Sequence, residues 1–264
     1  MDSINLANYI RSKSIQMCHK GNSSHIGSIL SCADILAVLY SKVINKNPNN
    51  PTNDSRDRFI MSKGHAGAGL YSVLSKLGFI EESVLETHYQ NGSYLSGHVC
   101  HKIFPGIEFS TGSLGHGLPF SVGKALALKL KKNKSRVFCL MSDGELDEGS
   151  NWEAFLSAAH HKLDNLIAII DRNRLQSIED TESTLALEPL LNKLKAFNWN
   201  VNEIDGHNHQ EIEFSLTKKN IDRPLILIAK TTKGKGISFM ENEVLWHYKS
   251  PSKDEVDKGL SELK

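Results

Sequence analysis

VFCLMSDGELDEG, at residues 137–149, and LIAIIDRNRLQ, at residues 166–176, carry the clearest structural pattern in the chain. Each opens with five consecutive apolar residues and passes directly into polar residues that favour turns. A short apolar run of this kind is typical of a strand buried on both faces, as in a parallel sheet. Residues 152–161, between the two runs, are expected to be helical. The two stretches therefore predict a strand–helix–strand unit.

Further strands and helices extend this pattern toward both ends of the chain. We expect additional strands at 58–62, 200–204 and 225–229, and helices at 4–18, 33–39, 67–77 and 118–130. Because there is no internal repeat and no linker, the sequence predicts a single α/β domain over residues 1–264. Its core would be a doubly wound, mainly parallel sheet flanked by helices on both faces. Residues 252–264 are expected to form a charged tail that is mobile or is ordered by a partner.

Charge and cysteine content narrow the class of protein. The 31 Lys and Arg residues against 30 Asp and Glu residues give a formal net charge of +1, which argues against a broad nucleic-acid-binding face. The longest apolar runs are too short to span a bilayer. The first residues lack the basic and apolar segments of a secretory leader, so we do not expect secretion. The cysteines form no CxxC pair, which favours reduced thiols in the cytoplasm. They are Cys18, Cys32, Cys100 and Cys139.

Asp143 and Asn173 carry oxygen donors at the ends of two successive predicted strands. A strand–helix–strand unit needs about 30 residues, which is their separation, so the two side chains can meet at adjacent strand ends. Mg²⁺ prefers carboxylate and carbonyl oxygens together with the phosphate oxygens of a ligand. Taken alone, Asp-Gly or Asn after a strand is more often an ordinary turn. Both interpretations, a metal–diphosphate site and a pair of turns, stay open on this spacing.

Histidine is frequent, with 12 residues. A single histidine in a loop is more often a surface residue, but four lie in separate loops flanked by glycine or aromatic residues: His25, His65, His98 and His247. Imidazole suits proton transfer near neutral pH and hydrogen bonds to sugar hydroxyls or phosphate. No HExxH or Cys/His spacing supports a zinc site. We interpret the following as structural or surface residues: His19, His88, His101, His160, His161, His207 and His209.

Two glycine loops, at 63–67 and 111–117, indicate close approach of the backbone to another group. Neither has the GxxxxGK[ST] order of a P-loop, and no GxGxxG opens a nucleotide-binding fold. By themselves these loops do not define a ligand.

Taken together, these stretches resemble the N-terminal, diphosphate-binding half of transketolase over nearly the whole chain. The matching motifs, in the family's order, are SHIG (24–27), RDRF (56–59), SKGHA (62–66), GH (97–98), PGIE (105–108), TGSLGHG (111–117), DGELDEG (143–149), DRNRLQ (171–176), KTTKGKG (230–236) and WH (246–247). Asp143-Gly144 with a later Asn173 is similar to the thiamine diphosphate signature.

The resemblance implies a role for each matching residue. Mg²⁺, or Ca²⁺ or Mn²⁺ in its place, would be held by Asp143, Asn173 and the Leu175 carbonyl. The ketose donor would be bound, and protons moved, by His25, His98 and His247. Glu148 would join a carboxylate network across a subunit interface. Thiamine diphosphate would be contacted by His65, Gly112, Ser113, Leu114, Gly144, Glu148, Asn173 and His247.

The resemblance also implies an activity and a partner. Transketolase transfers a two-carbon ketol unit from a ketose, here expected to be phosphorylated or nucleotide-linked, to an aldose. In that family a second, pyrimidine-binding domain supplies a glutamate that activates the cofactor, and a third, C-terminal domain follows it. We therefore expect a split transketolase, in which this chain is active only with a separate subunit carrying those domains, as an α2β2 assembly. An apolar face should be exposed where that subunit docks.

Five positions depart from the family pattern without removing a presumed metal ligand. Ser142 replaces the first glycine of Gly-Asp-Gly, Ile26 and Ser113 replace proline, His116 replaces glutamine, and Arg172 replaces Asp or Asn. Two alternatives stay open. One is a subunit of another thiamine diphosphate enzyme, of the 2-oxoacid dehydrogenase or deoxyxylulose-phosphate synthase type. The other is a non-catalytic cofactor-binding or regulatory paralogue.

Overall fold

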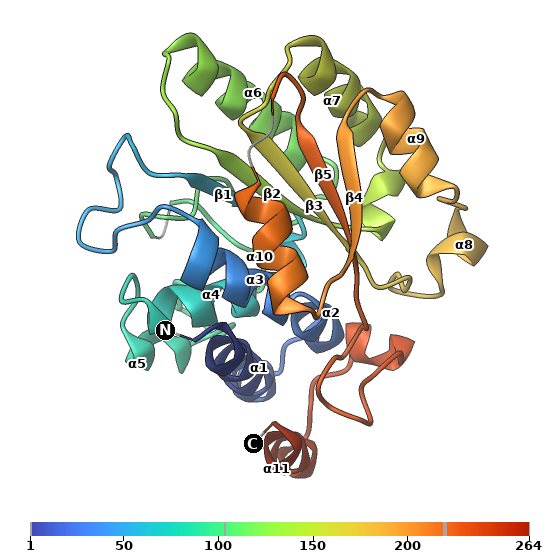
Figure 1. The fold of residues 1–264 in the computed structure, drawn as a ribbon. Coiled ribbons are helices and arrows are strands. Elements are labelled where there is room, and N and C mark those ends of the chain that lie inside the picture. The colour runs from blue at the N-terminus through green and yellow to red at the C-terminus, as the bar shows by residue number, and fades with distance from the viewer. Residues whose placement is uncertain (1, 103, 219–220, 264) are drawn as a thin grey trace.

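The computed structural model describes residues 2–102, 104–218 and 221–263, and within them the strands form one parallel sheet (Figure 1). In spatial order the strands are β1 (Arg58–Met61), β2 (Val137–Ser142), β3 (Leu166–Arg172), β5 (Leu225–Lys230) and β4 (Asn200–Asp205). All the neighbouring pairs run parallel. The predicted strands and the α/β class are therefore confirmed.

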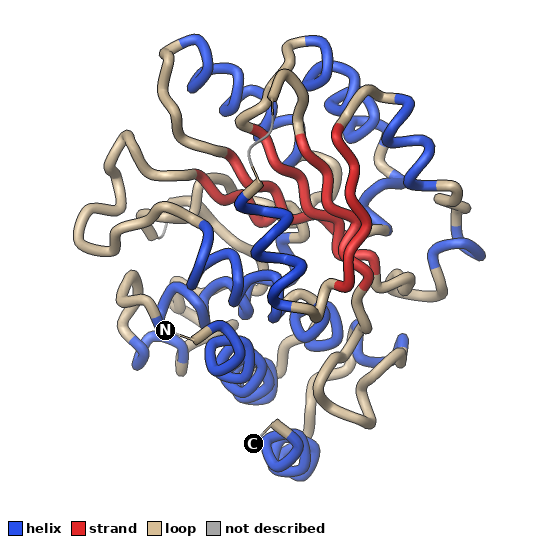
Figure 2. Tube along the Cα trace, viewed as in Figure 1, coloured by secondary structure: helices blue, strands red, loops and turns tan. Residues whose placement is uncertain are grey.

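Helices cover both faces of the sheet (Figure 2). One layer contains α1 (Ser3–Lys20), α2 (Ile26–Ser31), α3 (Ala33–Val38), α4 (Gly67–Lys76) and α10 (His209–Thr217). The opposite layer contains α6 (Gly117–Leu130), α7 (Gly149–His160) and α9 (Leu190–Ala196). Outside these layers lie α5 (Glu82–Leu85), α8 (Thr181–Thr184) and α11 (Lys253–Glu262). This arrangement confirms the doubly wound topology. No helix within the described residues has both the length and the apolar composition needed to cross a membrane.

The apolar runs of the central strands supply both hydrophobic cores. Along β2, Phe138 and Leu140 pack toward the layer that contains α1 and α4, whereas Cys139 and Met141 pack toward α6 and α7. Side chains alternate between the two faces of a strand, so a strand covered by helices on both faces must be apolar throughout. Cys18 and Cys32 are buried like Cys139, Cys100 is half-buried, and all four are free thiols.

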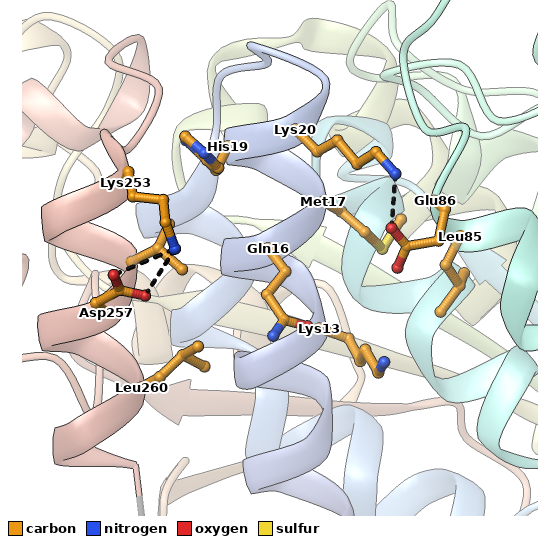
Figure 3. Close-up of a pocket in the computed structure, with 11 residues that line it drawn as sticks. Lys13, Gln16, Met17, His19, Lys20, Leu85, Glu86, Lys253, Asp257 and Leu260 are labelled. Atoms are coloured by element: carbon orange, nitrogen blue, oxygen red, sulfur yellow. Dashed lines mark hydrogen bonds and ion pairs between the residues drawn. The ribbon is translucent and has the colours of Figure 1, made fainter.

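Residues 252–264 require a correction to the predicted mobile tail. Within the described residues they form α11, which lies beside α1, with α5 on the other side of α1 (Figure 3). The helix begins with a capping box, in which the Ser252 side chain accepts a hydrogen bond from the Glu255 N–H and the Glu255 carboxylate accepts one from the Ser252 N–H. Val256 and Gly259 are buried. Most residues of this segment are charged, so the few apolar positions that face the protein were not recognised as one side of an amphipathic helix.

The register of the sheet brings the ends of its strands to one edge. Ser142 of β2 pairs with Asp171 of β3, and Asp171 pairs with Ala229 of β5. The loops that follow these strands therefore open at the same edge, where parallel sheets bind ligands.

Candidate functional site

A cavity of about 250 Å³ opens at this carboxyl edge of the sheet. Its lining includes the four histidines singled out in the sequence and the three predicted metal ligands: His25, His65, His98, His247, Asp143, Asn173 and Leu175. Gly112, Leu114 and Gly144 line the same cavity. Segments far apart in the sequence thus contribute to one concave site.

His25 lies close to each of the other three histidines of the site. The His25 ring centre is 5.3 Å from that of His65, 5.7 Å from that of His98 and 5.0 Å from that of His247. The backbone fixes this arrangement, because the His25 N–H donates to the His247 carbonyl at 2.7 Å. His25 also adopts a left-handed conformation, with φ of 75°, immediately before α2. The loops that carry these histidines, although far apart in the sequence, therefore lie together.

Burial and nearby positive charge keep these imidazoles neutral. Burial, reinforced by His98, lowers the pKa of His25 to about 4. Burial together with the Lys233 ammonium lowers the pKa of His247 to about 3. Burial also lowers the pKa of His65 well below its usual value, and that of His98 in the same direction. A neutral imidazole has one donor and one acceptor nitrogen, so each ring can take or give a proton.

Oxygen donors from β2 and β3 form another wall of the cavity. Asp143 Oδ2 accepts a hydrogen bond from the Arg174 N–H at 2.6 Å, so the ends of the two strands meet as predicted. Asn173 Oδ1 accepts from the Leu175 N–H at 3.1 Å. Asp143 is buried, and burial together with the charge of Asp171 raises its pKa. A buried carboxylate beside amide and carbonyl oxygens fits a hard divalent cation, which would stabilise its charge.

A metal site here could not be built from His, Cys, Asp and Glu side chains alone. Among the described residues, no group of three His, Cys, Asp or Glu side chains is placed to hold a metal ion. A metal ion at Asp143 would therefore need the Asn173 amide oxygen and the Leu175 carbonyl as further ligands.

The glycine loop at 111–117 packs tightly against the end of β1. A Cβ at Gly117 would lie 2.8 Å from the Ser62 Cα, and Gly115 has a φ of +81°, which favours glycine. Glu145 joins these segments, because its Oε1 accepts hydrogen bonds from the Gly115 N–H at 3.1 Å and from the Ser62 hydroxyl. The hydrogen bonds of Glu145 therefore hold the glycine loop at 111–117 against the end of β1.

Some residues singled out in the sequence do not line the cavity. Ser113 and His116 are exposed on the glycine loop, and Glu148 is exposed at the start of α7. Arg172, one of the departures from the family pattern, lies with Nη1 3.3 Å from Asp143 Oδ2 and is buried.

Two lysines at the site were not given a role from the sequence. Lys63 lines the cavity and forms a fully buried ion pair with Asp171. Burial alone would lower the pKa of Lys63, but the charge and hydrogen bond of Asp171, together with the nearby Cys32 and Asp143, raise it. Lys233 is also fully buried, and its Nζ lies 3.1 Å from both the Leu175 carbonyl and His247 Nδ1. Burial, then the charge of Lys63, lowers the pKa of Lys233 to about 8. Their only indication in the sequence was their position, since Lys63 lies within the SKGHA motif and Lys233 within the KTTKGKG motif.

Comparisons with known proteins agree with this geometry. Residues 3–263 match the family model described as the thiamine diphosphate binding domain of transketolase. The chain is 45% identical over 241 residues to a subunit of the apulose-4-phosphate transketolase of Actinobacillus succinogenes, covering 91% of this chain and 87% of that protein. It is 36% identical over 259 residues to the SqwG subunit of the 6-deoxy-6-sulfo-D-fructose transketolase of a Clostridium species, covering 97% and 94%.

Longer relatives match over only part of their length. Human transketolase is 38% identical over 261 residues, covering 97% of this chain but 41% of that protein. The crystal structure of transketolase from Campylobacter jejuni superposes with a TM-score of 0.93 at 34% identity, covering 100% of this chain and 43% of that one. The chain therefore belongs to the transketolase family, and it corresponds to the N-terminal, thiamine diphosphate-binding part that some members carry as a separate subunit.

Proposed function

We propose that this chain is the thiamine diphosphate-binding subunit of a two-chain transketolase, which transfers a two-carbon ketol unit from a ketose to an aldose. One observation carries the proposal: neutral histidines and the oxygen donors at the ends of β2 and β3 line the same cavity. The family match supports the cofactor, and the relatives named as single subunits of transketolases support a separate partner. Because two hydrophobic layers share one sheet, we take residues 1–264 as a single diphosphate-binding domain.

Asp143, Asn173 and the Leu175 carbonyl would hold Mg²⁺, or Ca²⁺ or Mn²⁺, against the diphosphate. His65, His247, Gly144 and the turn at 112–114 would contact the cofactor. When bound, thiamine diphosphate supplies the nucleophilic carbon on which a carbon–carbon bond can be broken. The proposed role of the protein chain is to hold the cofactor in place and to manage protons around the substrate.

His25, His98 and His247 would bind the ketose hydroxyls and move protons to and from substrate oxygens. The proton on His247 can be assigned from its contacts. A lysine ammonium has donors only, so Lys233 Nζ donates to His247 Nδ1 at 3.1 Å. The proton of the neutral ring therefore lies on Nε2, which leaves that nitrogen free to donate to a substrate oxygen.

Exposed apolar side chains at the rim of the cavity support docking of a partner. Tyr248 lines the cavity and is 63% exposed, and Leu245 and Ile178, next to lining segments, are 61% and 74% exposed. We propose that the partner covers this rim, supplies the activating glutamate and forms an α2β2 assembly. Glu148, exposed at the start of α7, would join its carboxylate network.

The proposed donor is a ketose with an anionic group at its far end, because relatives are named for apulose-4-phosphate and for 6-deoxy-6-sulfo-D-fructose. We place the enzyme in the cytoplasm on the ground of its four free cysteines.

The test begins with a tagged pull-down from the source cells, with the co-purifying chain identified by mass spectrometry. Ketol transfer is then assayed with thiamine diphosphate and Mg²⁺ for this chain, for the partner and for their mixture. We expect turnover only in the mixture. Robust turnover by this chain alone would contradict the split enzyme. Calorimetry that detects no cofactor binding by the mixture would favour the non-catalytic paralogue instead.

A further inference from the structure

The buried carboxylate of Asp34 is linked by hydrogen bonds to the loop at residues 232–235, which contains Lys233. Asp34, on α3, is 5% exposed. Its Oδ2 accepts hydrogen bonds from Arg11 Nη2 at 2.5 Å and from His207 Nδ1 at 2.7 Å, and its Oδ1 accepts one from His209 Nε2 at 3.0 Å. These donors come from α1 and from the segment that follows β4. Although burial alone would raise it, the pKa of Asp34 is held well below its usual range by the two histidines and Arg11.

Two of the three donors also hold the backbone of the loop. The Thr232 N–H donates to His207 Nε2 at 2.9 Å, and Arg11 Nε donates to the Lys235 carbonyl at 3.0 Å. Asp34 therefore connects to both ends of the segment 232–235 through one side chain at each end. We call Arg11, Asp34 and His207 the Asp34 clamp.

His209 differs from the members of the clamp. It also bonds Asp34, but its Nδ1 pairs with the Ser3 hydroxyl at 2.8 Å. Among the described residues, the His209 side chain therefore forms no hydrogen bond to the loop at 232–235. It provides a matched comparison with His207.

The hydrogen bonds assign the tautomer of His207. Because the Thr232 N–H donates to Nε2, that nitrogen must carry the lone pair, and the ring proton must lie on Nδ1, where it donates to Asp34. Both nitrogens of the ring are thus used, one for the carboxylate and one for the loop.

The clamped loop contacts the wall of the candidate site through the Lys233 side chain. Lys233 lies between the two clamped positions, and its Nζ donates to the Gln176 carbonyl at 2.7 Å as well as to the Leu175 carbonyl and His247. The Gly234 N–H donates to the Gly27 carbonyl at 2.9 Å, which ties the loop to the segment that follows His25. A shift of the loop would therefore move an ammonium that contacts both a predicted metal ligand and a predicted catalytic histidine.

We propose that the Asp34 clamp is a positioning device: Arg11, Asp34 and His207 fix the backbone of 232–235 and thereby hold the Lys233 ammonium against the Leu175 carbonyl and His247. None of its three residues is among those that line the cavity. Its effect on cofactor binding, although not the clamp itself, rests on the function proposed above.

The first test measures hydrogen exchange of the Thr232 amide in the full chain without cofactor. His207→Ala and His209→Ala each remove one donor from Asp34, but only His207→Ala removes the acceptor of the Thr232 N–H. We expect exchange at Thr232 to rise at least about tenfold in His207→Ala and to stay near that of the unaltered chain in His209→Ala. His207→Gln, whose side-chain oxygen can replace Nε2, should restore most of the protection. Equal exchange in the two alanine variants, or none above the unaltered chain, would overturn the clamp.

The second test measures thiamine diphosphate affinity with Mg²⁺, by calorimetry on the chain in complex with its co-purified partner. We expect a Kd at least about tenfold weaker in His207→Ala than in His209→Ala, at matched melting temperatures. An equal Kd in both, when the unaltered complex binds, would overturn the link from the clamp to Lys233. Failure of the unaltered complex to bind would count against the proposed function, and the exchange result would then decide the clamp.

Discussion

Asp143 combines deep burial with a negative charge. Its pKa is raised by burial and by Asp171, so a bound cation would relieve an unfavourable charge as well as gain a ligand. We expect Asp143→Asn to weaken binding of Mg²⁺ with thiamine diphosphate by about 100-fold or more. The melting temperature without ligands should change little. Thermal unfolding with and without both ligands measures the effect, because ligand binding stabilises only the native state.

Asp164→Asn is the matched control for Asp143→Asn. Asp164 is a half-buried carboxylate that pairs with Lys129 at 3.0 Å, just before β3 and away from the cavity. Its variant should keep the full rise in melting temperature on adding ligands. The same rise in the Asp143 variant would place the metal elsewhere.

The histidines of the site predict acid sensitivity. The pKa of His247 is about 3 and that of His25 about 4 in the folded chain, against about 6.5 when unfolded. Between these values only the unfolded chain is protonated, so stability is complete above about pH 6.5 and is lost as the pH falls toward 4. We expect each histidine to contribute a loss on the order of 1–2 kcal/mol, allowing for partial exposure to water.

Urea unfolding between pH 7 and 4 measures this loss. His247→Gln has no titrating group at this position, so its free energy of unfolding should fall less than that of the unaltered chain. Parallel pH profiles for the two proteins would show that other groups cause the acid sensitivity.

At the residue scale, the sequence predicts best the groups that directly follow strands. Asp143 and Asn173 could be placed together because the ends of adjacent parallel strands must meet. Lys63 and Lys233 could not be assigned, because a long side chain can extend to water or fold inward, and only the packed structure shows a buried ammonium beside Asp171 or His247.

At the element scale, α11 is stabilised by its first turn. The Ser252 side chain accepts a hydrogen bond from the Glu255 N–H, so Ser252→Ala should lower the free energy of unfolding by about 1 kcal/mol. Chemical denaturation followed by circular dichroism measures this change. Lys253→Ala, at the next position and with an exposed side chain paired with Asp257, should change it much less. Similar losses in both variants would argue against a specific role of the cap.

Several of the short helices could not be predicted from the sequence. The helices α2, α5 and α8 have four to six residues, too few for a helical period to be recognised. They are fixed by tertiary contacts and caps instead. The strand order was also open in the sequence. The structure places β4 at the edge of the sheet, next to β5. Polar residues such as Asn202 and Glu203 fit this edge position, but they do not by themselves fix the strand order.

At the scale of the whole molecule, the exposed rim of the cavity predicts where the second chain binds. A charge placed in an apolar interface costs desolvation, so Leu245→Glu should weaken association with the co-purified partner by at least about tenfold. Phe214→Glu on α10 is the control, since Phe214 is 71% exposed but lies away from the cavity. Analytical ultracentrifugation of each variant with the partner compares them. Equal weakening by both, or by neither, would move the interface away from this rim.

The distribution of the cysteines makes the chain suitable for site-selective labelling. Cys18, Cys32 and Cys139 are buried in the two cores, and burial raises their pKa values. Cys100 is half-buried two residues after His98, and a hydrogen bond to Ser110 lowers its pKa. A maleimide dye should therefore modify one thiol rapidly in the folded chain and all four after denaturation. That single fluorophore, two residues along the chain from the cavity-lining His98, would report arrival of the second chain in real time without any engineered cysteine.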